Sequence, residues 1–155
     1  MKEHVNLEFT NLLSYRAKIT QPEAQKMPSE LLQFINKHKL EKNGPIISTT
    51  YDTIIEDNEI FFDMEYFIPV KHPERLLKND KYKIKDELLL VNCIKETYKG
   101  SIMYVSNEIE KFMKNLEPYK DKLLSTVYTV NLNQIKSDRD LLEVELYISI
   151  NPNII

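Results

Sequence analysis

The sequence predicts a mixed α+β fold made of two diverged copies of one βαββ unit, because its two halves contain matching segments. A Ser-Thr-x-Tyr segment, an apolar pattern with helical spacing and a strand-like ending each occur twice, in the same order. Serial matches at a nearly constant offset, here 77, 78 and 80 positions, are typical of an internal duplication. The matches join Tyr51 to Tyr128, Phe34 to Phe112, and residues 64–70 to residues 144–150.

The first copy, about residues 5–70, is expected to contain a strand, a helix and a hairpin. Pro22 suits the first turn of a helix, where a missing N–H is tolerated. If Pro28 lies beyond that turn, the helix must begin later or kink. Asn43 and Gly44 are expected to end the helix in a left-handed conformation before Pro45. The expected elements are a strand at 7–19, a helix at 23–40, and strands at 46–55 and 60–70 around a loop at 56–59.

The second copy, about residues 88–150, repeats this order, and Gly100 marks the turn from its first strand into its helix. Residues 71–87 form a charged connector without clear periodicity, which indicates a surface crossover or a lid. A chain of this length is typical of one domain, so we expect a single domain over residues 1–155. The expected elements are a strand at 88–98, a helix at 102–116, and strands at 123–132 and 141–150.

We expect these strands to form one curved antiparallel sheet with both helices on one face. Successive side chains of a strand point to opposite faces. Glu65 and Phe67 therefore share the face away from the helices, and so do Glu145 and Tyr147 in the last strand. Each copy thus places a carboxylate beside an aromatic side chain. The residues assigned to the helix-covered face are Ile60, Phe62, Met64, Tyr66, Ile68, Val144, Leu146, Ile148 and Ile150.

The composition is that of a globular protein, with 42% hydrophobic and 29% charged residues. A net charge of -3 gives no basic footprint for nucleic acid. No apolar run approaches the ~20 residues that span a bilayer, and no signal-peptide pattern is present, so we predict a cytoplasmic protein without membrane insertion. Cys93 lies in an apolar segment and is expected in the core.

Metal and cofactor chemistry is not indicated. The histidines are scattered without the paired spacing of a metal site, and a Gly-rich phosphate loop is missing. We therefore expect neither a metal nor another cofactor.

Four short segments carry a resemblance to a known group: Asn43-Gly44-Pro45, Tyr98-Lys99-Gly100, and the strand endings at 65–70 and 145–148. They resemble segments of the bacterial effector-binding domains called GyrI-like, which occur in multidrug-responsive transcription activators and as separate proteins. The likeness covers nearly the whole chain and departs from the group's pattern at Ser149, where proline is usual. The length leaves no room for the DNA-binding region of such an activator, so we expect a free-standing domain.

Within this group the sequence is similar to a family of small proteins encoded in type VII secretion loci of low-GC Gram-positive bacteria. The similarity lies in the Gly-Pro strand entry and in the Glu-aromatic-aromatic-apolar-Pro-Val ending at 65–70. It implies a non-enzymatic accessory or adaptor factor whose partner is a secreted substrate or a secretion-system protein. Such a role calls for an exposed apolar patch or sheet edge.

The effector-binding resemblance implies an alternative function, the binding or scavenging of a small lipophilic cation. In that group a glutamate with aromatic side chains commonly lies in the cleft between the halves, and the matching position here is Glu145, with Glu65 as its counterpart. A desolvated carboxylate attracts the cation, and the rings add area and cation-π contact. A solvated sheet face with cross-strand pairs explains the same pattern equally well. The candidate ligand-binding residues are Glu65, Glu145, Phe67, Tyr147, Tyr51 and Tyr128.

A second alternative is a GyrI-like hydrolase in which Glu145 and Tyr128 act together, although an enzymatic activity is less expected than binding. In a ligand-binding cleft, desolvation or mutual repulsion should favour the protonated form of Glu65 or Glu145. Phe34 and Phe112 are expected to be core anchors of their helices.

Overall fold

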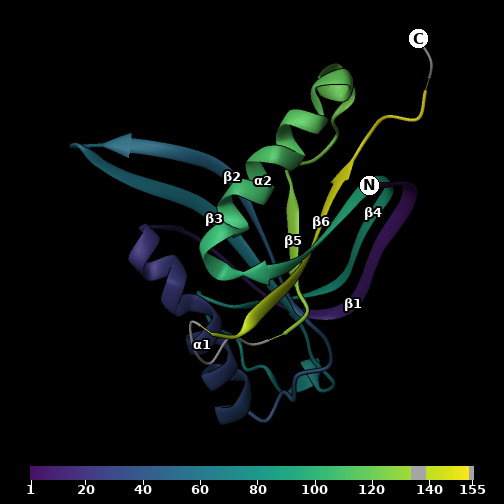
Figure 1. Ribbon diagram of the computed structural model, residues 1–155. Helices are drawn as coiled ribbons and strands as arrows, with labels where there is room; N and C mark the ends of the chain where they lie inside the picture. The colour runs from purple at the N-terminus through teal and green to yellow at the C-terminus, as the bar shows by residue number, and fades with distance from the viewer. Residues whose placement is uncertain (134–138, 154–155) are drawn as a thin grey trace. The chain divides into compact units, whose positions relative to one another are not determined.

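The computed structural model describes residues 1–133 and 139–153 of the chain, and it confirms a mixed α+β fold with antiparallel strands (Figure 1). Within the described residues, no helix is long and apolar enough to cross a membrane. The main elements are β1 (Lys2–Ile19), α1 (Gln21–Lys37), β2 (Ile46–Glu56), β3 (Glu59–Pro69), β4 (Lys83–Ser101), α2 (Val105–Asn115), β5 (Tyr128–Asn131) and β6 (Leu141–Ser149). Short 3-10 helices are η1 (Pro73–Arg75), η2 (Ile102–Tyr104) and η3 (Glu117–Lys122).

The chain divides into two compact units, which are described separately below. The α1 unit is Glu8–Leu88, and the α2 unit is Met1–Leu7 together with Leu89–Ile155. In the α1 unit, β3 pairs with both β1 and β2, and in the α2 unit, β6 pairs with both β4 and β5. Each unit therefore has an antiparallel arrangement centred on its last strand.

Helix α1 begins two residues before the predicted start because Thr20 forms a capping box with Glu23. The Thr20 side chain accepts a bond from the Glu23 backbone N–H, and the Glu23 carboxylate accepts a bond from the Thr20 backbone N–H. The helix ends at Lys37, earlier than predicted. Lys39 and Glu41 take the left-handed conformations that had been expected of Asn43 and Gly44. Gly44 is required for another reason, since a Cβ there would lie 2.8 Å from Pro69 Cγ.

Pro28 lies inside helix α1 and neither delays its start nor ends it. Proline has no N–H, so the carbonyl of Ala24, one turn earlier, loses its usual helical donor. The Tyr66 hydroxyl of β3 donates a hydrogen bond to that carbonyl at 3.2 Å. A strand residue thus supplies the bond that the proline removes, which the local sequence of the helix could not reveal.

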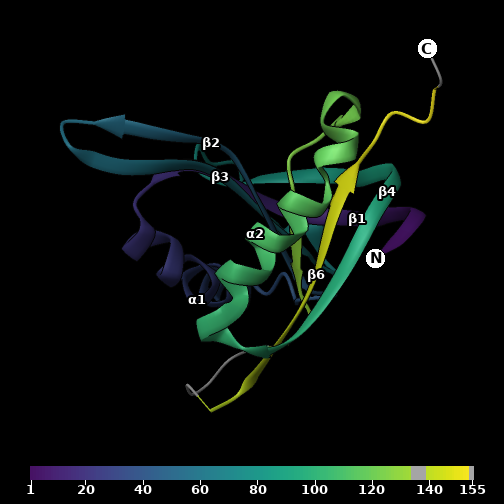
Figure 2. The same cartoon turned by 45° about the horizontal axis from the view of Figure 1, so that its top comes forward.

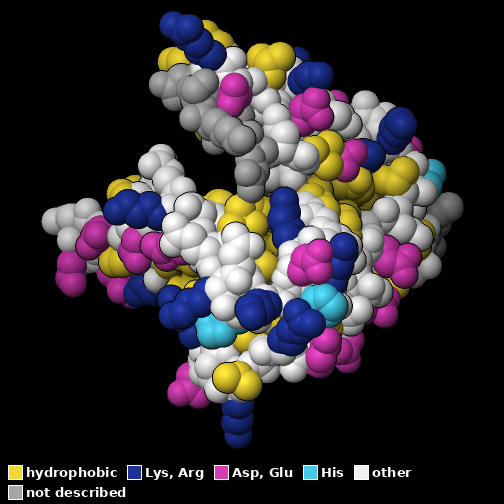
Figure 3. Space-filling model, turned by 90° about the horizontal axis from the view of Figure 1, so that it is seen from below, with side chains coloured by type: hydrophobic (Ala, Val, Ile, Leu, Met, Phe, Trp, Pro, Cys, Tyr) yellow, Lys and Arg dark blue, Asp and Glu magenta, His cyan; other side chains and the backbone are white. Residues whose placement is uncertain are grey.

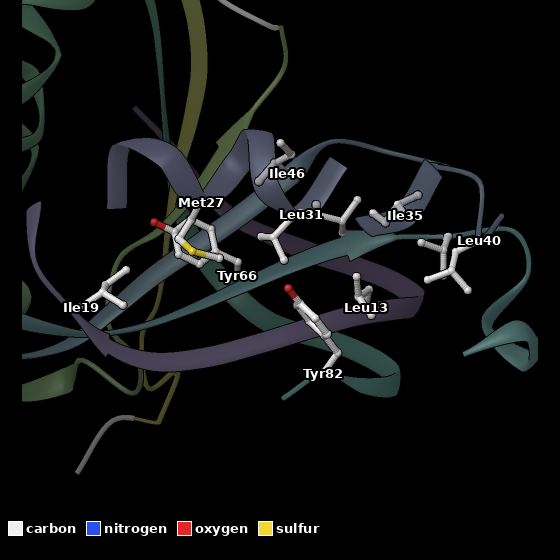
Figure 4. Close-up of a cluster of buried hydrophobic side chains, with 11 residues drawn as sticks. Leu13, Ile19, Met27, Leu31, Ile35, Leu40, Ile46, Tyr66 and Tyr82 are labelled. Atoms are coloured by element: carbon white, nitrogen blue, oxygen red, sulfur yellow. The ribbon is translucent and has the colours of Figure 1, made fainter. Parts of the chain in front are cut away.

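The core of the α1 unit lies between α1 and its strands. Figure 4 shows Met27 and Leu31 of α1 facing Tyr66 of β3, as the alternation of β3 predicted. Phe34 is only partly buried, so the prediction that it anchors this core is wrong, and Leu31 and Ile35 fill that role. The buried residues of this cluster are Leu13, Ile19, Met27, Leu31, Ile35, Leu40, Ile46, Tyr66, Ile68, Val70 and Tyr82.

Tyr82 belongs to the segment predicted as a surface connector, yet it is buried in this core. Its ring lies 4.0 Å from that of Phe34 and 5.5 Å from that of Tyr15, measured between centroids. Strand β4 starts directly after it, at Lys83, inside the range predicted as connector. Burial of an aromatic ring therefore holds the end of this segment against α1.

The β2–β3 hairpin turns at Asp57 and Asn58, both of which have positive φ, as a tight two-residue hairpin turn requires. Ile60 was assigned to the helix-covered face, but 52% of its surface is exposed. It pairs with Ile55 near the tip of the hairpin and does not belong to the buried cluster beneath α1. The alternation is correct for β3 as a whole, but the strand is longer than the helix that covers it.

The core of the α2 unit is smaller, and α2 lies along β4 and β6 (Figures 1 and 2). Phe112 is 1% exposed and is a core anchor, as predicted. Strand β5 is shorter than the predicted strand at 123–132, and Leu123 makes an isolated bridge to Ile150 instead. Cys93 is fully buried, as expected, and its burial raises the pKa of the thiol. The buried residues of this cluster are Ile94, Phe112, Leu116, Leu146, Ile148 and Ile150.

The backbone confirms the duplication, at offsets of 80 to 81 that agree with one of the three sequence matches. The Glu41 carbonyl accepts a bond from the second residue after β3, and the Lys122 carbonyl accepts one from the second residue after β6. The two carbonyls are 81 residues apart (122 minus 41). Asn11 and Asn92 both have a φ of 53° and both accept a bond from the end of that strand, again at 81 (92 minus 11). The two units therefore share one backbone plan.

Two of the three sequence matches are shifted relative to this plan. Ile47 pairs with Phe67 and Tyr128 pairs with Tyr147, so Tyr128 is the structural counterpart of Ile47 and not of Tyr51. The same offset places Phe112 with Leu31, not with Phe34. Short matches of Ser, Thr and aromatic residues arise readily in strands, whereas backbone contacts are not subject to that ambiguity.

Candidate functional site

Glu65 is the most buried acidic side chain among the described residues, with 3% of its surface exposed. It lies on the face of β3 away from α1, as predicted. Ser14 Oγ donates a hydrogen bond to Glu65 Oε2 at 2.5 Å, and the Tyr51 hydroxyl donates one to Oε1 at 2.6 Å. Lys85 Nζ lies 2.7 Å from Oε2. We call Ser14, Tyr51, Glu65, Phe67 and Lys85 the Glu65 cluster.

Strand register explains how these residues meet. Ser14 of β1 lies directly opposite Phe67, the second residue after Glu65, so both point to the same face. The β2–β3 register shifts between Thr50 and Asp52, which leaves Tyr51 as the extra residue of a bulge. A bulge redirects a side chain, and here it accompanies the Tyr51 hydroxyl bond to Glu65.

Lys85 approaches both the carboxylate and the aromatic ring of this cluster. Its Nζ lies 5.3 Å from the centroid of the Phe67 ring, within the range of a cation-π contact. The Lys85 side chain is 44% exposed, although its partner carboxylate is almost fully buried. The ammonium group of Lys85 is thus placed as a bound organic cation would be, between a carboxylate and a ring.

Glu65 is ionised at neutral pH. Burial acts to raise the pKa of Glu65, but the hydrogen bonds from Lys85, Ser14 and Tyr51 outweigh burial and lower this pKa below its ordinary value. The expectation of a protonated glutamate is therefore wrong for Glu65, because the cluster supplies donors that stabilise the charged form.

Arg16 extends the cluster towards the surface. Its guanidinium carbon lies 4.2 Å from the centroid of the Tyr51 ring, and it makes a two-pronged pair with Asp63 at 2.8 and 3.1 Å. Bonding to Arg16 lowers the pKa of Asp63. The Tyr51 side chain is thereby held at two points. Its hydroxyl donates a hydrogen bond to Glu65, and the Arg16 guanidinium stacks on the face of its ring.

Glu145 in the α2 unit has a comparable but simpler environment. Lys95 Nζ lies 2.5 Å from Glu145 Oε2, and the Tyr147 hydroxyl donates to Oε1 at 3.1 Å. Lys95 Nζ is also 5.5 Å from the centroid of the Tyr147 ring. The bond to Glu145 raises the pKa of Lys95, which keeps the amine protonated. Tyr128 lies opposite Tyr147 on β5, and we call these four residues the Glu145 cluster.

The predicted site residues thus fall into one group per unit. Tyr51, Glu65 and Phe67 lie together in the α1 unit, and Tyr128, Glu145 and Tyr147 lie together in the α2 unit. The cleft between the halves that was expected to join them stays a prediction. So does the hydrolase pair of Glu145 and Tyr128.

Sequence reasoning missed Ser14, Lys85 and Lys95. Ser14 and Lys95 lie on the strands next to the glutamates, so a correct strand register would have identified them. Lys85 lies in the segment predicted as a charged connector. Its spacing of two residues from Lys83, at the start of β4, is the pattern of a strand and was the signal that could have placed it on one.

Other kinds of site have less support. Figure 3 shows basic and acidic side chains intermixed on the face in view, without the single-sign area that nucleic-acid binding requires. Among the described residues, no group of His, Cys, Asp and Glu could hold a metal ion. A shallow depression lined by Met1, Lys2, Lys95, Glu96 and Thr97 lies in the α2 unit beside the Glu145 cluster.

Comparisons with known proteins show likeness of fold and not of sequence. No protein-family model matches the chain, and no curated protein matches it. A cryo-EM structure of an EcmrR–DNA complex has a TM-score of 0.65 at 12% identity, covering 95% of this chain and 56% of that chain. This likeness shows a shared fold, and the chain spans little more than half the length of the EcmrR chain.

Two further solved structures have lower scores. SAV2435 bound to tetraphenylphosphonium has a TM-score of 0.45 at 14% identity, covering 98% of this chain and 95% of that chain. A putative bacterial transcription regulation protein from Staphylococcus aureus MU50 has a TM-score of 0.41 at 15% identity, covering 96% and 99%. Membership of the GyrI-like group and the relation to type VII secretion loci stay predictions.

Proposed function

We propose that this protein binds small organic cations that carry apolar surface. The observation that supports this proposal is the Glu65 cluster, in which an ionised carboxylate and an aromatic ring are both in contact with an ammonium group. Desolvated carboxylates are rare in proteins unless they have a partner, and aromatic faces attract cations. The cluster has the chemistry that selects a cation over a neutral or anionic ligand.

The resemblance to effector-binding domains supports the same ligand class, because that group commonly uses a glutamate and aromatic side chains. Phe67 supplies an aromatic face beside Glu65, now in contact with the Lys85 ammonium group, and such a ring contributes both area and cation-π attraction. A lipophilic cation also loses little hydration on binding, unlike a metal ion or a primary amine. Binding should therefore depend on charge and on apolar area together.

The test uses a pair of compounds with similar shape and different charge. Isothermal titration of the whole chain with methyltriphenylphosphonium should show saturable binding, and triphenylphosphine oxide, which is neutral, should show much weaker binding. The variant Glu65→Gln/Glu145→Gln, which removes both carboxylates, should abolish the difference between the two compounds. Equal binding of both compounds, or no saturable binding of the cation, would overturn the proposal.

A second candidate function is that of a protein-binding accessory factor, which one observation favours. Three consecutive apolar residues of η2, Ile102, Met103 and Tyr104, are 41%, 78% and 60% exposed. Contiguous exposed apolar side chains often mark a site of interaction with another protein. The link to type VII secretion comes from sequence resemblance alone.

A pull-down from the native host tests this second function. The wild-type chain should retain a secreted substrate or a secretion-system protein, and Met103→Glu/Tyr104→Glu should lose it while keeping its melting temperature. Retention of the same proteins by both chains would contradict a role for this surface.

A further inference from the structure

We propose that the two clusters have diverged in function, so that a ligand replaces Lys85 at Glu65, whereas Lys95 permanently fills the corresponding place at Glu145. This inference rests on the proposed cation-binding function. It assigns the ligand to one carboxylate and makes Lys85 an internal competitor for it.

Ser14 and Lys95 occupy equivalent positions in the strand registers of the two units. Ser14 lies opposite Phe67 on β1, and Lys95 lies opposite Tyr147 on β4. The same place beside the glutamate is thus occupied by a short hydroxyl side chain in one unit and by a lysine in the other. Because Ser14 is short, the cation at Glu65 must come from elsewhere in the unit, and Lys85 supplies it.

The two glutamates would also keep different hydrogen bonds if their lysines moved away. Without Lys85, Glu65 would keep the hydrogen bonds from Ser14 and Tyr51, one to each carboxylate oxygen. These neutral donors hold the carboxylate in place and stabilise its charge without supplying a competing cation. In the described part of the chain, Glu145 would keep the hydrogen bond from the Tyr147 hydroxyl, at a longer distance of 3.1 Å. The Glu65 site is therefore already organised for an incoming cation, which lowers the cost of binding.

The two lysines also differ in how far their side chains are exposed to solvent. The Lys85 side chain is 44% exposed and the Lys95 side chain is 21% exposed. A lysine that is nearly half exposed can move its ammonium group into water and regain side-chain freedom. Lys95 is more enclosed, so its ammonium group is less free to move into water and its side chain regains less freedom. Exchange at Glu65 is thus easier than exchange at Glu145.

Reciprocal substitutions test the inference, with methyltriphenylphosphonium as the probe in titrations of the whole chain. The wild type should bind one equivalent. Glu65→Gln should weaken binding by about tenfold or more, and Glu145→Gln by less than about twofold. Lys95→Ser copies the Glu65 arrangement into the α2 unit and should add a second equivalent.

Changes in the α1 unit should act in the opposite sense. Lys85→Ser removes the internal competitor and should tighten binding about three- to tenfold. Ser14→Lys copies the Glu145 arrangement and should abolish binding, with circular dichroism to confirm that the variant is folded. If Ser14→Lys does not fold, Lys85→Ser and Lys95→Ser decide the question, because both lysines are at least partly exposed.

The outcomes separate this inference from the proposed function. If the cation binds but Glu145→Gln weakens it as much as Glu65→Gln does, or if Lys85→Ser weakens it, the assignment to Glu65 is overturned and cation binding stands. If neither the wild type nor any of the variants binds the cation, both are overturned. Binding that follows the pattern above supports both.

Discussion

The α1 unit and the α2 unit share a backbone plan, but they reach it with different side chains. The α1 unit has the longer helix, which the Thr20 capping box stabilises at its N-terminus, and a large core cluster that includes two buried tyrosines. Helix α2 begins at Val105, its N-cap residue Tyr104 makes no side-chain capping bond, and its core cluster is smaller. The comparison teaches that equivalent positions must be taken from backbone contacts, since even well-matched sequence segments are displaced by several residues. The following predictions test or refine this comparison, beginning with the largest expected effect.

Truncation of the aromatic residue in each helix should have unequal effects. Phe112→Ala should destabilise the protein by about 3 to 5 kcal/mol, because the ring is fully buried in a small core. Phe34→Ala should cost about 1 to 2 kcal/mol, because that ring is only partly buried against Tyr82 and His38. Urea unfolding measures both changes. Equal costs would restore the equivalence of Phe34 and Phe112 that the sequence suggested.

The bond from Tyr66 to the Ala24 carbonyl should matter because of Pro28. Tyr66→Phe should cost about 1 to 3 kcal/mol, since a partly buried carbonyl loses its donor. Pro28→Ala supplies a backbone N–H for the same carbonyl, so Tyr66→Phe should cost less in that background. A double-mutant cycle of urea unfolding measurements gives the coupling between the two positions. Zero coupling would mean that the hydroxyl bond does not compensate for the proline.

Removal of the cap of helix α1 should have a moderate effect. Thr20→Ala should cost about 1 kcal/mol, because the first turn of α1 loses its acceptor and the Glu23 interaction. Ser101→Ala, which removes the side-chain bond to the Met103 N–H at the start of η2, is the matched change in the α2 unit. It should cost less, because that cap precedes a 3-10 turn outside α2. Thermal melts of the two variants would show the opposite order if the α2 unit depended more on capping.

The Glu65 cluster should make stability depend weakly on pH in the acid range. The pKa of Glu65 is lowered in the folded chain, so its stabilising contribution is present above the unfolded value of about 4.3 and is lost as pH falls through the folded pKa. The difference in unfolding free energy between wild type and Glu65→Gln should therefore be largest near neutral pH and shrink below about pH 4. A difference that stays constant from pH 7 to the acid range would contradict an ionised, hydrogen-bonded Glu65.

Much of the fold could be predicted because local patterns determine it. Period-2 alternation correctly placed the side chains of Glu65 and Tyr66 on opposite faces of β3, and helical spacing correctly made Phe112 a core residue. The βαββ order followed from turn residues and apolar periodicity. Errors arose where a distant contact decided the outcome, as at Pro28, whose place inside α1 depends on a hydroxyl group from β3.

The candidate site was predicted in part for the same reason. The residue types at Glu65, Phe67, Glu145 and Tyr147 and the face they share followed from the sequence by itself, because alternation along one strand is a local property. Their charge partners did not. Ser14 and Lys95 meet the glutamates through strand register, and Lys85 reaches Glu65 from the start of β4, so residues distant in sequence lie within 3 Å of each other. Tertiary structure therefore decided the ionisation of Glu65, because the pKa of a buried carboxyl depends on the donors that neighbouring strands bring to it.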